Sequence, residues 1–227
     1  MTTPDDNAPV GKRPRGRPPG DKREQVLRVA PEFFARYGFR QTRWGDVGAA
    51  VGLQSSGLYY YFESKLHCLY EVIERTIDGW HDRFDAITSR PAPYEEQLVE
   101  VLFDTYDLTD EELLKTRVVV AEWGRVAIHR SSGREERARL DTRARIHDLE
   151  YAWGTFLARG MAEGVVTEDD PRVLTRALLG LRQSIWYWYE PGGRLTLDDL
   201  AVFYVRRQLA LLGAPRALID KAGGGRG

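Results

Sequence analysis

Cysteine is almost absent from this 227-residue chain, and long apolar runs are missing altogether. The single cysteine, Cys68, excludes an intramolecular disulfide and fits a reducing compartment. Because Cys68 lies in an apolar helical stretch, we expect a small buried side chain rather than a redox sensor. The sequence has no apolar run of membrane-spanning length and no signal-peptide core at its start. These absences predict a cytoplasmic protein that does not contact membranes.

Residue groups that carry out chemistry are also missing. The four histidines are scattered and form no spacing typical of zinc ligands; they are His67, His81, His129 and His147. The sequence contains no glycine-rich phosphate loop, no nucleophile elbow and no pair of carboxylates in an apolar setting. We therefore expect no metal site, no cofactor and no enzymatic activity.

Charge is balanced over the whole chain but not along it. Lysine and arginine total 33 and aspartate and glutamate total 34, which gives a net charge of −1. Between residues 11 and 24, however, Asp21 and Glu24 are the acidic residues and the basic ones are Lys12, Arg13, Arg15, Arg17, Lys22 and Arg23. Such a local excess is typical of a segment that faces nucleic acid.

Residues 1–20 contain proline, glycine and charge but almost no apolar residues, so we expect a disordered basic arm. Within it, the run Pro14-Arg15-Gly16-Arg17-Pro18 is similar to the core of an AT-hook. In that motif two arginines, here Arg15 and Arg17, follow a narrow minor groove across A·T pairs. The alternative is a solvated arm that attracts DNA without sequence preference.

The stretch from Thr42 to Lys65 is predicted to form two short helices joined by a tight turn. Thr42 can cap the first helix, and Gly52 stands where a left-handed backbone favours glycine. The residues expected to face inward are Val47, Ala50 and Val51 in the first helix and Leu58 and Phe62 in the second. Leu53 and Tyr61 are further apolar residues of the second helix and its exit. This arrangement is a helix-turn-helix, whose second helix reads base edges in the DNA major groove.

Small, hydrogen-bonding and aromatic residues separate these apolar positions. The candidate DNA contacts are Thr42, Arg43, Gln54, Ser55, Ser56, Gly57, Tyr59, Tyr60 and Lys65. Lys65 opens the next predicted helix, where its side chain and the backbone amides can meet phosphate. The alternative is a helical hairpin that serves only packing.

The segment from Val26 to Leu66 resembles the DNA-binding domain of TetR-family transcriptional regulators. The matching residues are Phe33, Phe34, Gly38, Thr42, Val47, Gly52, Leu53, Leu58, Tyr59, Tyr61, Phe62, Ser64 and Lys65. The departures are Gln54 in place of a capping serine, Ser55 in place of a common lysine, and Pro31 inside the first helix. The resemblance implies binding to an operator in double-stranded DNA.

Beyond the break at Arg90-Pro91-Ala92-Pro93 the pattern is helical throughout. Helix starts are predicted at Thr109 with Glu112, at Asp170-Pro171, and at Thr196 with Asp199. Gly160 and Gly164 are expected to end the long helix before Asp170. We predict an all-α chain with a three-helix helix-turn-helix domain over 21–66, a helical ligand-binding and dimerisation bundle over 67–215, and a flexible tail over 216–227.

The last two long helices are apolar on nearly all sides, over 177–189 and 203–212. A helix of this kind is buried on more than one side, so a partner chain is indicated. The candidate interface residues are Ala177, Gly180, Leu181, Ser184, Trp188 and Phe203. This agrees with the TetR-family arrangement, in which two C-terminal helices pair with their twofold mates.

Aromatic residues are frequent beyond residue 79, and those between bundle helices can line a pocket for an apolar ligand. The candidates are Phe103, Tyr106, Trp123, Trp153, Phe156 and Trp186. The segment 186–195, with 160–164 before it, resembles a TetR subgroup whose better-known members sense fatty-acyl or steroid-derived coenzyme A thioesters.

These features together predict a homodimeric repressor that a small apolar effector, with an acyl-CoA thioester as one candidate, releases from a palindromic operator. Two alternatives remain. One is a constitutive DNA-binding protein whose C-terminal part only dimerises. The other is a helical enzyme with vestigial DNA contacts.

Overall fold

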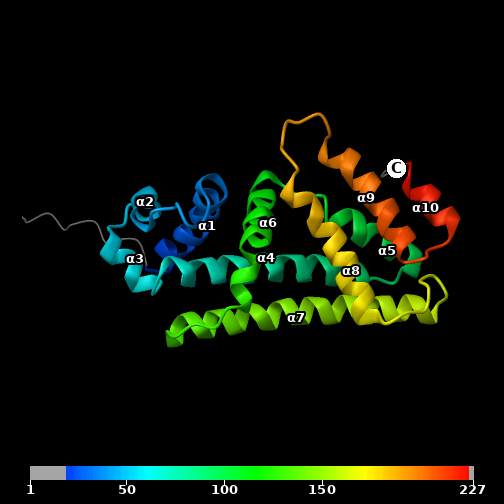
Figure 1. Cartoon of the computed structure of the whole chain (residues 1–227), viewed down its shortest axis with the longest axis horizontal. Helices are drawn as coiled ribbons and strands as arrows, with labels where there is room; N and C mark the ends of the chain where they lie inside the picture. The colour runs from blue at the N-terminus through cyan, green and yellow to red at the C-terminus, as the bar shows by residue number, and fades with distance from the viewer. Residues whose placement is uncertain (1–18, 225–227) are drawn as a thin grey trace, which may run out of the picture.

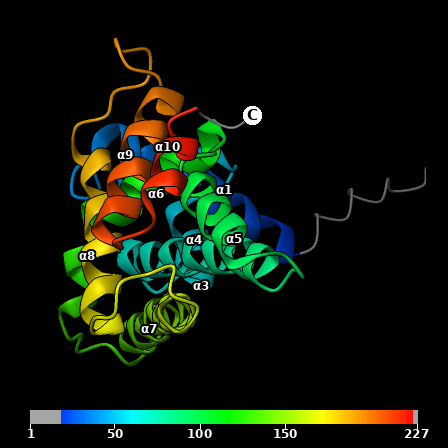
Figure 2. The same ribbon diagram turned by 90° about the vertical axis from the view of Figure 1, so that its right-hand side faces the viewer.

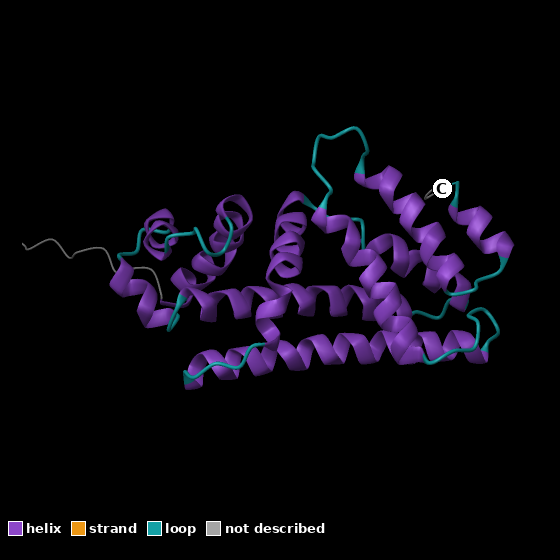
Figure 3. Ribbon diagram, viewed as in Figure 1, coloured by secondary structure: helices purple, strands orange, loops and turns teal. Residues whose placement is uncertain are grey.

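The computed structural model describes residues 19–224, which form ten α-helices and two short 3-10 turns without a β-strand. The elements in order are α1 (Pro19–Tyr37), α2 (Trp44–Ala50), α3 (Ser55–Tyr61), α4 (Lys65–Thr88), α5 (Tyr94–Asp104), α6 (Asp110–Glu122), η1 (Trp123–Ala127), α7 (Gly133–Ala162), α8 (Pro171–Ser184), η2 (Ile185–Tyr187), α9 (Leu197–Leu211) and α10 (Arg216–Ala222). Figure 3 shows the helices joined only by loops. The prediction of an all-α fold is confirmed.

The helices gather at the two ends of an elongated molecule. Figure 1 shows α1, α2 and α3 at one end and α5, α8, α9 and α10 at the other. The long helix α4 runs between the ends, and α7 packs alongside it in both views (Figures 1 and 2). Helix α6 stands between the groups and packs against α1 as well as α4. The predicted domain boundary at residues 66 and 67 therefore falls inside α4.

The first three helices bury one compact core. Val47, Val51, Leu58 and Phe62 are all buried there, as predicted, and Gly52 takes the left-handed conformation with φ of +68°. Ala50, however, is exposed, so the prediction that it faces inward is wrong. The first residue of α2, Trp44, is buried instead, and its ring packs edge-on against Phe62 with 5.9 Å between ring centroids.

Thr42 does not cap α2, contrary to the prediction. Arg43 occupies the cap position of α2 and makes no side-chain capping bond. The Thr42 hydroxyl instead donates to the carbonyl oxygens of Phe33 at 3.0 Å and Gly38 at 2.9 Å. The side chain thereby closes the turn after α1, which leaves it buried.

The predicted helix starts in the C-terminal part are confirmed. Thr109 with Glu112 and Thr196 with Asp199 form reciprocal capping boxes, and the Asp170 carboxylate accepts from two backbone amides at the start of α8. These signals act within one helical turn, so they can be recognised without knowledge of the tertiary structure.

Two expectations about helix ends are wrong. Gly160 lies inside α7 and does not end it. A glycine is needed there because the Tyr94 ring occupies the space that a Cβ at Gly160 would fill. The left-handed residue after α7 is Gly164, with φ of +74°. The predicted flexible tail includes α10, which packs against α9 and buries Ala222. The basic arm, with Arg15 and Arg17, lies outside the described residues.

Candidate functional site

One face of α3 is anchored in the core and the opposite face is open to solvent. Leu58 and Phe62 are fully buried, whereas Tyr59 is 55% exposed and Tyr60 is 73% exposed. Tyr60 also meets the half-buried Tyr61 edge-on, with 5.0 Å between ring centroids. The predicted contact residues that the structure exposes are Arg43, Gln54, Ser55, Ser56, Tyr59 and Tyr60. Since α3 is fixed through its apolar face, these side chains are presented outward.

A close approach of α2 and α3 sets the angle of that face. A Cβ on Gly48 would come within 2.8 Å of Leu58 Cδ1 and 3.0 Å of the Leu53 carbonyl oxygen, so only glycine fits here. Gly57, predicted as a DNA contact, is half-buried beside Leu53. A small residue at position 57 therefore allows Leu53 of the turn to pack against α3.

Lys65 is used inside the protein, contrary to the prediction that it contacts DNA. Its Nζ donates to the carbonyl oxygens of Phe39 at 2.5 Å, Thr42 at 2.7 Å and Arg40 at 3.3 Å. The ammonium also lies 4.5 Å from the centroid of the Phe39 ring. Burial, followed by the nearby Arg125 charge, lowers the pKa of Lys65. Lys65 thus ties the loop before α2 to the start of α4, and the buried Thr42 side chain belongs to the same loop.

Two basic side chains beside α2 remain available for phosphate. Arg40 and Arg43 are both exposed, and neither takes part in an ion pair among residues 19–224. The sequence predicts a DNA contact for Arg43 but not for Arg40. The only signal for Arg40 in the sequence is its position in the short loop that leads into α2.

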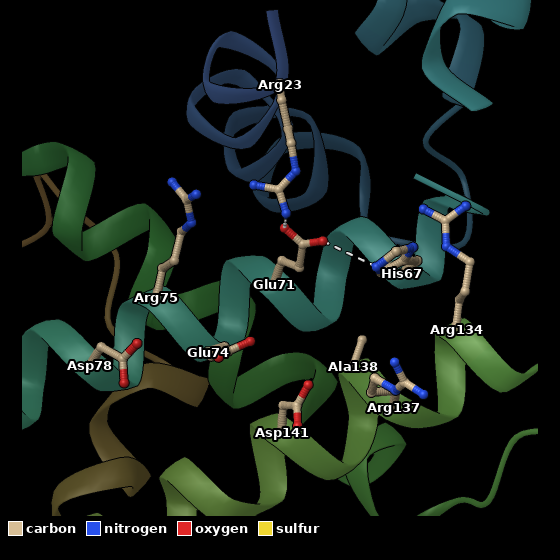
Figure 4. A pocket seen from close by; sticks show the side chains of 10 residues that line it. All are labelled: Arg23, His67, Glu71, Glu74, Arg75, Asp78, Arg134, Arg137, Ala138 and Asp141. Atoms are coloured by element: carbon tan, nitrogen blue, oxygen red, sulfur yellow. Dashed lines mark hydrogen bonds and ion pairs between the residues drawn. The ribbon is translucent and has the colours of Figure 1, made fainter. Parts of the chain in front are cut away.

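A charged groove lies between α1, α4 and α7 (Figure 4). It has a volume of about 470 Å³. In it, Arg23 of α1 binds Glu71 of α4, and Glu71 also lies 3.1 Å from His67 Nε2. Burial, together with the charges of Asp78 and Asp141, raises the pKa of Glu74.

The corner between α3 and α4 is also bound to the start of α7. The Ser132 hydroxyl donates to Glu63 at 2.5 Å, and the backbone amide of Glu135 donates to the same carboxylate at 3.2 Å. Ser64 in turn donates to the Glu135 side chain. The corner that follows α3 is therefore held on the start of α7.

The six predicted pocket residues do not line one cavity. Trp153 lines a small cavity in the middle of the helical bundle, Phe156 an open groove between α4 and α7, and Phe103 a groove beside α10. Tyr106 packs against Tyr204. The remaining two are Trp123, which is half-buried in η1, and Trp186, which packs against Tyr189. Most of them therefore contribute to the hydrophobic core.

The small cavity contains polar groups that aromatic content alone did not indicate. Its volume is about 20 Å³, and Thr116 of α6, Trp80 of α4 and Arg182 of α8 are among its lining residues. Arg182 is only 6% exposed, and burial lowers the pKa of its guanidinium to about 10. The sequence signal for this site is Arg182 itself, the one charged residue between Ala177 and Tyr189.

The predicted interface residues lie on α8, α9 and the loop between them. Ala177 and Gly180 are exposed on α8, in line with Val173, which is 62% exposed. Trp188 and Phe203 are about half exposed. The other two face the core side: Leu181 is half-buried, and the Ser184 hydroxyl is bonded to Tyr204 Oη at 3.0 Å. The α8–α9 pair thus presents an apolar outer face.

The fold and the exposed α3 define a helix-turn-helix DNA-binding protein. Residues 26–72 match the family described as "Bacterial regulatory proteins, tetR family". Residues 91–212, more than half of the chain, match the family described as "Tetracyclin repressor-like, C-terminal domain". The chain belongs to the TetR family of transcriptional regulators.

Similar proteins include the HTH-type transcriptional repressor KstR2 of Rhodococcus jostii. It is 26% identical over 198 residues, which cover 86% of this chain and 92% of that protein. KstR2 of Mycolicibacterium smegmatis is 24% identical over 191 residues, covering 82% of this chain and 88% of that protein.

Among solved structures, AibR in complex with isovaleryl coenzyme A and operator DNA aligns with a TM-score of 0.69. The two sequences are 18% identical, and the alignment covers 83% of this chain and 98% of the AibR chain. The ketosteroid regulator KstR2 of Mycobacterium tuberculosis aligns with a TM-score of 0.68 at 23% identity, covering 86% and 95% of the two chains. At these identities the likeness establishes the fold.

Two other kinds of site, a metal site and a membrane-spanning helix, do not occur in the described residues. No group of three or more His, Cys, Asp or Glu side chains between residues 19 and 224 is placed to hold a metal ion. Within the same range, no helix combines the length and the hydropathy needed to cross a membrane.

Proposed function

We propose that this protein is a homodimeric repressor that binds a palindromic operator in bacterial cytoplasm and leaves it when a small apolar ligand enters the helical bundle. The observation that carries the proposal is the orientation of α3, with Leu58 and Phe62 buried and Ser55, Tyr59 and Tyr60 exposed. A helix fixed in this way can enter the major groove and place polar and aromatic groups against base edges.

The exposed arginines supply phosphate contacts in this proposal. Arg40 and Arg43 precede or begin the first helix of the motif, where side chains reach the DNA backbone and fix the register of the reading helix. The basic arm adds Arg15 and Arg17 on the minor-groove side. A role as a repressor is supported by the similar protein KstR2 of R. jostii, which is described as a transcriptional repressor.

The apolar outer face of α8 and α9 supports a dimer. Val173, Ala177 and Gly180 follow one line along α8, and small residues among them permit close contact between helices. Phe203 adds an exposed ring on α9. A twofold-symmetric dimer formed through this face has two copies of α3. A palindromic operator requires these two helices to lie about one DNA turn, roughly 34 Å, apart.

Release by a ligand needs a mechanical path from the bundle to the DNA, and α6 supplies one. Thr116 of α6 lines the central cavity, and α6 packs against α1 of the DNA-binding domain. A ligand that prefers the released arrangement a hundredfold per site shifts the equilibrium by about 2.7 kcal/mol, and by roughly twice that in a dimer. Acyl-CoA thioesters are one candidate class, since AibR was solved with isovaleryl coenzyme A.

The dimer face can be tested with Ala177→Arg and Phe203→Arg. Both residues are exposed in the single chain, so an arginine leaves its core intact but places an unpaired charge in the proposed interface. We expect both variants to sediment as monomers and to bind operator DNA at least a hundredfold more weakly. Leu140→Arg, an equally exposed apolar position on α7, is the matched control and should remain dimeric.

Dimers that persist in both variants would place the interface elsewhere. If the protein is a dimer and no ligand weakens its binding to the operator, the result would favour a constitutive DNA-binding protein. Chemical turnover of a bound ligand would instead favour a helical enzyme.

A further inference from the structure

Arg182 is a buried cation that forms no direct ion pair with any residue between 19 and 224. Its side chain lies in the helical bundle, and its Nε has no hydrogen-bond acceptor. The guanidinium lies over the ring of Trp80, with 4.6 Å to the ring centroid. An aromatic face stabilises a cation only partly, so a charge at this depth still needs an anion.

The acidic residues near Arg182 are engaged by a different arginine. Arg83 Nε lies 2.9 Å from the Asp104 carboxylate, and Arg83 Nη1 lies 3.0 Å from Glu112. Arg83 Nη2 also donates to the Asp104 carbonyl oxygen at 2.6 Å. Asp104 also lines the cavity and acts on Arg182 through its charge, but Arg83 holds its carboxylate, so no acceptor reaches Arg182 Nε.

Hydroxyl groups without partners lie in the same region. Thr116 of α6 lines the cavity with Arg182, and Tyr106 lies near enough that the Arg182 charge opposes the rise in the pKa of Tyr106 that burial causes. The hydroxyl oxygens of both residues are buried and neither has a hydrogen-bond partner. Buried polar atoms are nearly always satisfied in folded proteins, so several unsatisfied donors around one cation indicate a missing acceptor.

Arg83, Asp104 and Thr105 also line the cavity, and the remainder of its lining is apolar. Its walls include Trp80, Leu108, Leu149 and Trp153. The volume of about 20 Å³ suffices for roughly one water molecule, so neither a carboxylate nor the body of a ligand fits unless the surrounding helices move. An apolar body can enter only where the surrounding helices separate.

We infer that the effector is an apolar molecule with a carboxylate, and that Arg182 binds this carboxylate inside the bundle with Thr116 as a second donor. A planar guanidinium can donate two parallel hydrogen bonds to the two oxygens of a carboxylate. An uncharged head group would leave the cation unpaired. The inference rests on the proposed ligand response and adds the chemistry of the ligand.

The position of Arg182 also indicates how binding acts on DNA. The cavity lies between Trp80 of α4, Thr116 of α6 and Arg182 of α8, and α4 and α6 are the helices that contact α1. A carboxylate held by Arg182 directs the apolar body between these helices. Their separation tilts α1 and the helix-turn-helix.

The test is a thermal-shift and tryptophan-fluorescence screen of the full-length protein without DNA. The probes are decanoate, 3-phenylpropanoate and cholate, each paired with its alcohol or methyl ester. Two further probes are the coenzyme A thioester of decanoic acid and the coenzyme A monothioester of decanedioic acid. Only the second keeps a carboxylate, at the far end of its acyl chain. Together with decanoate, they distinguish binding of a free acid from binding of a carboxylate on an acyl-CoA. We expect at least one carboxylate probe to bind tenfold or more tightly than its uncharged partner.

Arg182→Leu should abolish that preference, and Arg182→Lys should retain part of it. The leucine variant is expected to fold, because it removes an unpaired buried charge. Arg176→Leu, an exposed arginine on the same helix, is the matched control and should keep the preference. A wild-type protein that binds acids and uncharged partners equally, or none of the probes, would overturn the inference. So would an Arg182→Leu variant that retains the preference.

This outcome is independent of DNA binding. A protein that prefers carboxylates but keeps its operator when they bind would support the inference and contradict release by the ligand. A protein that binds its operator but shows no carboxylate preference would contradict only the inference.

Discussion

Tyr60 is the most exposed aromatic side chain of the DNA-binding domain, with 73% of its surface open. Its backbone is fixed by the buried Leu58 and Phe62, so loss of the ring leaves the core unchanged. We predict that Tyr60→Ala weakens specific operator binding by about 1–3 kcal/mol, the usual value of one good base contact, at an unchanged melting temperature. Fluorescence anisotropy and thermal melting measure the two effects.

Tyr37→Ala is the matched control for Tyr60, because Tyr37 is also an exposed tyrosine but lies at the end of α1. It should leave operator affinity unchanged. A lower melting temperature for Tyr60→Ala with full operator affinity would mean that α3 faces the other way.

Lys65 and Arg43 are both basic, but the structure predicts opposite effects of removing them. Lys65→Ala takes a donor from three carbonyl oxygens and should cost about 1–3 kcal/mol of folding stability. Arg43→Ala should leave stability unchanged and reduce the slope of log affinity against log salt by about 0.9 for each lost phosphate contact. Urea unfolding and salt-dependent anisotropy distinguish these results.

The same two residues show a limit of sequence reasoning. Both are basic residues beside a recognition motif, and the sequence assigns both to DNA. The three carbonyl oxygens that bind Lys65 come from a loop more than 20 residues earlier, and no local pattern reports this contact. Arg182 is a similar case, since its burial without a direct ion pair among the described residues is visible only after folding.

At the level of elements, the contact between α2 and α3 depends on Gly48. Alanine raises intrinsic helix stability by about 1 kcal/mol, but its Cβ would meet the Leu53 carbonyl and the buried Leu58 side chain. Overpacking of this kind costs about 1–3 kcal/mol, so Gly48→Ala should be destabilising on balance and should tilt α3. Gly57→Ala meets only Leu53 Cδ2 at 3.4 Å and should not be destabilising. Equal urea midpoints for the two variants would contradict this account of the packing.

Helix starts could be predicted from the sequence, whereas some helix ends could not. The capping residues Thr109, Asp170 and Thr196 act on amides within three residues, which makes them a local signal. Gly160 has a tertiary cause, the ring of Tyr94. Helix α10 spans seven residues and is stabilised by packing on α9, so its short sequence carries little signal of its own.

At the level of the whole molecule, the proposed dimer requires two exposed surfaces to act together. The outer side of α3 lies at one end of the chain and the apolar face of α8 and α9 toward the other (Figure 1). The long helices α4 and α7 connect them, and the contacts of Arg23 with Glu71 and of Ser132 with Glu63 hold the DNA-binding helices on this frame. A rigid frame is what allows a dimer to keep two α3 helices at a defined spacing.

The central claim is that two copies of α3, joined through α8 and α9, read one palindromic operator. The most direct test is to select fragments of genomic DNA with the purified full-length protein, sequence them, and count the bound chains by sedimentation. The account predicts an inverted repeat whose half-site centres are separated by about 10 base pairs or a multiple of that, with bound chains in pairs. Fragments without an inverted repeat, or a single chain bound to each site, would contradict it.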